Sequence, residues 1–172
     1  MFESERAFHL KPRYKNQQIM IQRIQSIYLL MASVAIYLLF VFPVANIYMP
    51  NGAKKITVTG IYESINGQVV QTVPFTFLTI ATVILGLIPL VLIFLFKHRK
   101  RQLTLVYLSV LVFIGFSFWL AQSVKAAAEI TMQLSDYGIG AGLSSVAILF
   151  LVLAGKAIQR DDKLVKSADR LR

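Results

Sequence analysis

Few side chains in this sequence are of the types that carry out chemistry, and they are widely spaced. The chain has 172 residues, with two histidines and no cysteine. Without cysteine there is no disulfide or thiolate chemistry. His98 stands among four cations in the segment 97–101, and neighbouring positive charge opposes both its protonation and its binding of a metal ion. We therefore expect no metal site and no cofactor.

Three acids are the remaining candidates for general acid–base chemistry. They are Glu63, Glu129 and Asp136, which lie in segments that we predict to be loops on one face of a membrane. Two carboxylates can act as acid and base when they converge on a substrate. These three are scattered, and scattered loop acids are usually solvated. We expect no catalytic residue and no enzyme, although a membrane enzyme using these acids is our third hypothesis.

The composition of the chain indicates which structural elements position these residues. Hydrophobic residues make up 56% of the chain and charged residues 15%, against about 45–50% and about 25% in soluble domains. The apolar residues gather in four runs, and an isolated span in hydrocarbon must be helical to satisfy its own backbone. The runs cover about 27–47, 74–96, 103–124 and 138–158, the last extended past Lys156 by snorkelling.

Basic residues orient these spans. Fifteen of the eighteen Lys and Arg residues precede the first run, join the second to the third, or lie from Lys156 at the end of the fourth run onward. The positive-inside rule places that side in the cytoplasm. The sequence therefore predicts a multi-pass membrane protein with both termini cytoplasmic.

A short β structure is expected outside the membrane, either a hairpin or a three-stranded cap to which 56–59 adds a strand. Asn66-Gly67 is a strong hairpin signal between segments of strand-forming residues. The predicted fold class is an all-α membrane protein, a four-transmembrane-helix bundle with a small extracytoplasmic β-hairpin between the first two helices. Three parts are expected, which are a mobile basic extension at 1–18, the helical domain at 19–160 with the hairpin loop at 50–73, and an amphipathic juxtamembrane tail at 161–172.

Small residues within the runs suggest two special positions. Gly138 and Gly142 form a small-x-x-x-small pattern near Ser145, which lets helices approach closely. This face packs within the bundle or contacts a partner subunit. Gly86 and Pro89 lie in the second run, where proline kinks a helix. The kink is either fixed or a hinge.

The basic cluster between the second and third runs is interpreted as a headgroup anchor. It comprises Lys97, Arg99, Lys100 and Arg101, and cations beside a span contact anionic lipid headgroups. A nucleic-acid role is not expected, because no aromatic interleaving or binding motif accompanies the cluster. The expected partners are the lipid bilayer and another membrane protein.

Two stretches carry a resemblance to a known family. They are 20–30 (MIQRIQSIYLL), which opens the first run, and 164–172 (LVKSADRLR), which ends the chain. With four spans between them, they resemble the domain-of-unknown-function family 4293, small membrane proteins of Bacteroidota. The likeness covers about Met20 to Arg172. It implies a bacterial inner-membrane location and no activity.

The leading functional hypothesis is a non-enzymatic accessory subunit of an inner-membrane complex. An outer hairpin that needs support, a Gly-rich helix face and an amphipathic tail all favour a partner. The alternative is a small transporter or lipid-handling protein, which predicts a cavity among the helices opened at Gly86 and Pro89. The uncharged spans disfavour transport, because ion and proton paths normally need ionisable residues.

Overall fold

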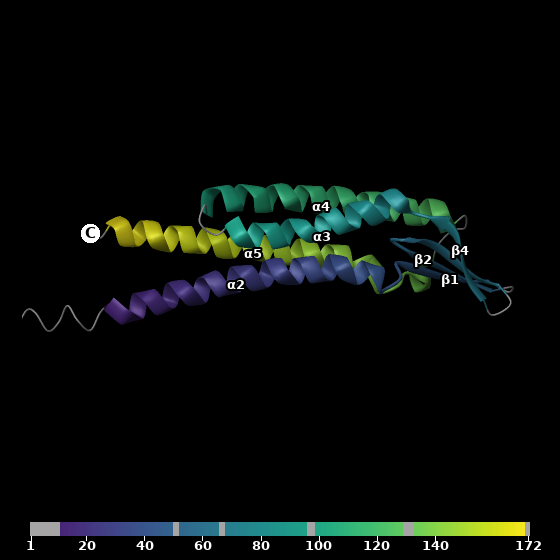
Figure 1. Cartoon of the computed structure of the whole chain (residues 1–172), viewed down its shortest axis with the longest axis horizontal. Coiled ribbons are helices and arrows are strands. Elements are labelled where there is room, and N and C mark those ends of the chain that lie inside the picture. The colour runs from purple at the N-terminus through teal and green to yellow at the C-terminus, as the bar shows by residue number, and fades with distance from the viewer. Residues whose placement is uncertain (1–10, 50–51, 66–67, 96–98, 129–132, 171–172) are drawn as a thin grey trace, which may run out of the picture.

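The computed structural model describes residues 11–49, 52–65, 68–95, 99–128 and 133–170. These residues form four α-helices, two 3₁₀ turns and four strands (Figure 1). In chain order they are α2 (Lys11–Tyr37), η1 (Leu38–Phe40), β1 (Ala45–Met49), β2 (Gly52–Thr57), β3 (Gly60–Ile65), β4 (Gln68–Pro74), α3 (Thr76–Phe94), α4 (Arg99–Ala128), η3 (Leu134–Asp136) and α5 (Gly140–Arg170).

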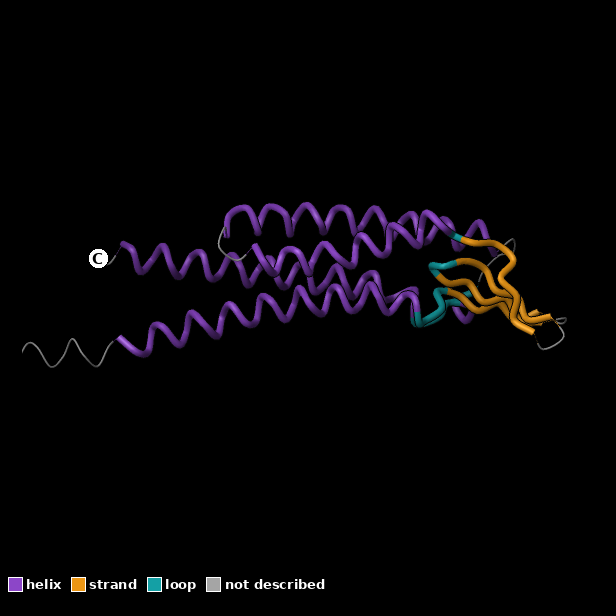
Figure 2. Tube along the Cα trace, in the orientation of Figure 1, coloured by secondary structure: helices purple, strands orange, loops and turns teal. Residues whose placement is uncertain are grey.

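The helices lie side by side, and the strands gather at one end of them (Figure 2). α2 packs against α3 and α5, and α4 packs against α5 and α3. At the end away from the strands, α2 and α5 run on past α3 and α4 (Figure 1). The helices bury a common apolar core that includes Leu29, Ile36, Phe113 and Leu151, while Phe77, Leu111 and other large apolar residues stay exposed on their outer faces. Apolar outer faces suit helices whose solvent is lipid.

Three helices among the described residues are long and apolar enough to cross a membrane. They are Thr76–Phe94, Lys100–Ala128 and Gly140–Lys163. The apolar part of the first helical segment, Ile24–Phe40, is shorter, with 17 residues. At about 1.5 Å per residue it extends about 26 Å. The chain is therefore a membrane protein on the evidence of three helices rather than four.

The strands form one antiparallel sheet in the order β1-β2-β3-β4. Ile56 pairs with both Ala45 of β1 and Ile61 of β3, so β2 lies between these two strands. Ile47, Ile56 and Val58 are buried with the helix core, which attaches the sheet to the ends of the helices. The outer side of β1 meets the segment before α5 through a bridge between Ala45 and Tyr137.

The predicted fold class is wrong. The structure is not an all-α bundle with a small hairpin, because a four-stranded sheet accompanies the four helices in the described part of the chain. The segments 60–65 and 68–74 do pair as a hairpin, and the turn at 66–67 lies outside the described residues. However, residues 45–49 form β1, although the sequence predicted that 45–47 would be the end of the first span. Their apolar character serves burial in a sheet as well as in a membrane.

Gly60 is a position where the sheet requires glycine. It begins β3 with a φ of +150°, and a β-carbon there would collide with the backbone oxygen of Val73 in β4. We predict that Gly60→Ala lowers the free energy of unfolding by about 1–3 kcal/mol, the usual cost of strained backbone. Thermal unfolding in detergent measures this change.

Gly115→Ala is the matched control, because no described atom outside its own stretch of α4 lies within 4 Å of a β-carbon at Gly115. Its stability should be unchanged or higher by about 0.5–1 kcal/mol, since alanine is the better helix former. Equal stability of Gly60→Ala and the parent protein would contradict the sheet geometry.

Candidate functional site

The predicted glycine face is divided in the structure. Gly138 precedes α5, and its N–H donates to the Val44 oxygen at 2.9 Å. A β-carbon at Gly138 would collide with the Pro43 carbonyl. Gly142 and Ser145 lie one and two turns into α5 and are exposed, with no described atom outside the local helix within 4 Å of a β-carbon at Gly142. The small residue at 138 therefore permits contact with the loop before β1, not with a neighbouring helix.

The predicted kink lies at a polar seam between α2 and α3. Gly86 and Pro89 are both buried in α3. The Ser33 hydroxyl donates to the Gly86 carbonyl at 2.7 Å, and the Tyr37 hydroxyl donates to the Val83 carbonyl at 3.3 Å. The Tyr37 ring lies against the α-carbon of Gly86, where any side chain would collide with it. Two hydroxyls from α2 thus attach to α3 one or two turns before the proline.

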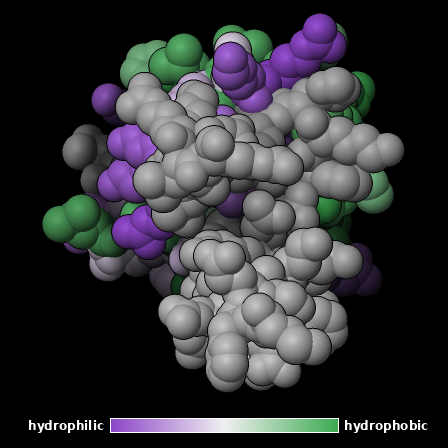
Figure 3. Space-filling model, turned by 90° about the vertical axis from the view of Figure 1, so that its left-hand side faces the viewer, coloured by the Kyte–Doolittle hydropathy of each residue, from purple (hydrophilic) through white to green (hydrophobic). Residues whose placement is uncertain are grey.

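The predicted headgroup anchor is described in part. Lys97 lies outside the described residues, Arg99 begins α4, and the side chains of Lys100 and Arg101 are exposed. The neighbouring Gln102 is buried, and its amide donates to the Leu92 carbonyl at 2.8 Å, which joins the end of α3 to the start of α4. Figure 3, which faces this end of the molecule, shows hydrophilic residues gathered beside the grey residues and hydrophobic ones around the sides.

The candidate acids have separate partners. The Glu63 carboxylate lies 3.7 Å from the Lys54 ammonium, across β2 and β3. The Asp136 carboxylate accepts the Gln133 backbone N–H at 2.8 Å in η3. Glu129 is outside the described residues. Within the described ranges no group of three His, Asp or Glu residues could hold a metal ion. The two described carboxylates thus serve local structure and do not form a pair with each other.

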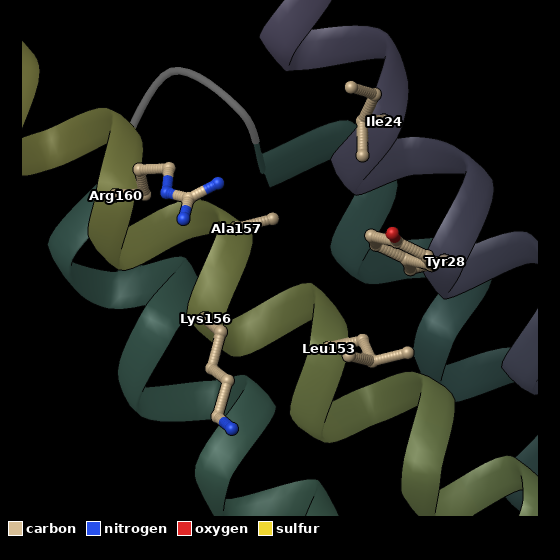
Figure 4. A pocket seen from close by; sticks show the side chains of 6 residues that line it. All are labelled: Ile24, Tyr28, Leu153, Lys156, Ala157 and Arg160. Carbon is tan, nitrogen blue, oxygen red and sulfur yellow. The ribbon is translucent and has the colours of Figure 1, made fainter.

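A pocket between α2 and α5 was not foreseen from the sequence. It has a volume of about 410 Å³, within the usual range for small-molecule sites. Figure 4 shows its lining side chains, which come from two helices far apart in the chain. They are Ile24, Tyr28, Leu153, Lys156, Ala157 and Arg160. The pocket is thus lined by apolar side chains and by two cationic residues.

The open edge of the sheet at β4 was also not foreseen from the sequence. All seven of its residues are exposed, including Val69 at 69% and Val70 at 53%. Adjacent residues of a strand point to opposite faces, so both faces of this edge are uncovered. No described strand pairs with its outer side. The Asn66-Gly67 hairpin signal predicted a strand here, but not that it would be the open edge.

Spanning-length helices with an antiparallel sheet at one end define a helical membrane protein with a sheet cap. The family model described as Domain of unknown function (DUF4293) matches residues 21–171. The chain therefore belongs to this family, and the resemblance noted in the sequence is confirmed. No curated protein matches the chain.

The seam between α2 and α3 yields a prediction about packing. Gly86→Val must displace the Tyr37 ring, so it should lower the free energy of unfolding by about 1–3 kcal/mol, as overpacking does. Gly142→Val, on an exposed face of α5, should change it by less than about 0.5 kcal/mol. Unfolding titrations with dodecyl sulfate measure both. Equal losses at the two positions would contradict the seam.

Proposed function

We propose that this protein is a non-enzymatic accessory subunit of a larger complex in the inner membrane of a bacterium, and that β4 pairs with an extended segment of another membrane protein. The observation that carries the proposal is the open, uncharged edge of the sheet at β4. The membrane character and the family are established by the helices and the family match.

An open edge strand has unpaired backbone N–H and C=O groups that can recruit another chain. Natural edges are commonly protected by charged side chains or by a covering segment. β4 has the sequence QVVQTVP, with no charge and three exposed valines. A partner strand would satisfy the backbone groups and cover Val69, Val70 and Val73. By contrast, the opposite edge at β1 already meets Tyr137.

The hydroxyl groups within the helices favour this proposal over transport. Thr82 donates to the Leu78 carbonyl at 2.7 Å, and Ser117 donates to the Phe113 carbonyl at 2.8 Å. Ser33 is committed to Gly86. Side chains that satisfy backbone carbonyls give no polar lining for a transport path. The separate partners of Glu63 and Asp136 likewise favour a non-enzymatic role.

The proposed topology places the sheet outside the cytoplasm and both termini inside it. Fifteen of the eighteen Lys and Arg residues occur in the sequence before the apolar part of α2, at 97–101, or from Lys156 onward, and the positive-inside rule assigns these segments to the cytoplasm. The apolar part of α2 then crosses the membrane beside α3 and α5, against which it packs. Further partners are lipids and not nucleic acid, and the family resemblance suggests a Bacteroidota source.

Partner capture tests the role of β4. The tagged chain, produced at native level and purified in mild detergent, should retain a stoichiometric membrane protein in mass spectrometry. The double variant Val69→Lys and Val70→Lys should lower its recovery by about tenfold or more, because buried unpaired charge opposes strand pairing. Both side chains are exposed, so the variant should fold.

The matched control is Tyr48→Lys, at an 81% exposed position on β1. It should retain the partner. Recovery of lipid alone from the parent protein, or of only a second copy of the same chain, would contradict the proposal. Equal loss in the β4 variant and the control would remove β4 as the contact.

Cysteine labelling tests the topology, because the natural chain has no cysteine. Leu134→Cys introduces a thiol near the sheet at a position that is 92% exposed, and Lys163→Cys introduces one in the exposed far part of α5. A membrane-impermeant maleimide should label the first in intact spheroplasts and the second only after permeabilisation. The reverse pattern, or labelling of both in intact spheroplasts, would contradict the topology.

A further inference from the structure

We propose that the pocket between α2 and α5 is a binding site for one anionic phospholipid, whose phosphate lies between Lys156 and Arg160 and whose acyl chain follows the groove between the two helices. This site goes beyond the proposed role of β4 and rests on different residues. Four observations support it, namely charge, apolar lining, depth and the anchored rear wall of the pocket.

The charge of the pocket suits a phosphate group. Lys156 and Arg160 are four residues apart on α5 and both are exposed, so they lie on the same face of the helix. None of the six lining residues in the described chain is acidic. In Figure 4 the Arg160 guanidinium lies beside Ala157, and the Lys156 side chain extends from the preceding turn of α5, away from the guanidinium. Guanidinium and ammonium groups are the usual donors to phosphate oxygens.

The apolar lining suits a lipid better than free phosphate. Ile24 and Tyr28 of α2 face Leu153 of α5 across the pocket (Figure 4). The apolar lining continues toward the sheet on both helices. Met31 follows Tyr28 by three residues on α2, and Leu149 precedes Leu153 by four residues on α5, so each pair lies on one face of its helix. Met31 and Leu149 are both large, apolar and exposed. An acyl chain can therefore run from the pocket along two apolar stripes, whereas inorganic phosphate would leave the lining unused.

The depth of the pocket corresponds to the headgroup region. Residues 140–155 of α5 carry no charge, and sixteen residues of helix extend about 24 Å. Lys156 and Arg160 therefore lie about 24 to 30 Å from the sheet end, close to the full thickness of about 30 Å of the hydrocarbon core. Gly155 is level with Tyr107, which lies about two turns into α4. The two cations stand where a headgroup phosphate would be.

The rear of the pocket is anchored by a contact between the two helices. The buried Gln25 side chain of α2 donates to the Ala157 carbonyl of α5 at 3.5 Å. Ala154 and Ile158 of α5 are buried on either side of Ala157. The walls are therefore held at a defined separation before any ligand enters, which reduces the ordering cost of binding.

The test is a lipid titration of the full chain in detergent, followed by native mass spectrometry. Phosphatidylglycerol should form a one-to-one complex, and phosphatidylcholine should bind at least about tenfold more weakly. The double variant Lys156→Gln and Arg160→Gln should weaken phosphatidylglycerol binding by about 25-fold, at about fivefold for each cation near an anionic group. Both side chains are exposed, so this variant should fold.

The matched control is Lys55→Gln with Lys125→Gln, which removes the same charge from exposed positions that lie outside both the pocket and the predicted headgroup anchor. Its affinity should stay within about twofold of the parent protein. Ala157→Phe, which fills the pocket and keeps both cations, should also abolish the complex.

Three outcomes would overturn the proposal. Equal weakening in the two charge variants would mean general surface attraction. Equal affinity for phosphatidylcholine would mean that the cations do not select the headgroup. Displacement of phosphatidylglycerol by millimolar inorganic phosphate would mean that the pocket is a site for free phosphate and not for a lipid.

Discussion

The junction at residues 42–44 determines how the helices and the sheet are joined. The Pro43 carbonyl accepts the Gly140 N–H, and the Val44 carbonyl accepts the Gly138 N–H, both at 2.9 Å. The Val44 N–H in turn donates to the Ile56 carbonyl of β2 at 2.9 Å. One short segment therefore follows the first helix and η1, leads into the sheet and positions the start of α5. Only glycine fits at 138 and 140, because a β-carbon at either would meet the Pro43 backbone.

The helical region and the sheet, which meet at this junction, satisfy their polar groups in different ways. Within the helices, Ser, Thr, Tyr and Gln side chains bond to backbone carbonyls, as at Ser33, Gln102 and Ser117. These side chains therefore do not provide a polar lining for transport through the helical region. The sheet satisfies its backbone between strands but ends at β4, which has an open edge. The two proposed binding surfaces therefore lie toward opposite ends of the molecule. β4 lies at the sheet end, and the pocket beside Lys156 and Arg160 lies toward the other end.

The sequence predicted what depends on local pattern. Uncharged apolar runs located α3, α4 and α5, and Asn66-Gly67 between strand-forming residues indicated the pairing of β3 with β4. It did not reveal β1, because Ala45, Asn46 and Ile47 continue an apolar run, and burial in a sheet uses the same residue types as burial in lipid. The glycine pattern at 138 and 142 was read as a helix face because spacing alone cannot show that α5 begins at Gly140.

The pocket and the open edge could not be predicted, because both depend on which segments meet. Ile24 and Arg160 are far apart in the chain, and only the packing of α2 against α5 makes them neighbours. Likewise, β4 is an edge only because the chain places β1 and β2 on the other side of β3.

The central claim, that β4 pairs with a partner protein, is tested most directly by photo-crosslinking in living cells. A benzoylphenylalanine in place of Val69 should give one adduct with a different membrane protein on irradiation, whereas the same group in place of Tyr48 should not. An adduct from position 48 alone, an adduct that contains only two copies of this chain, or no adduct from position 69 would contradict the claim.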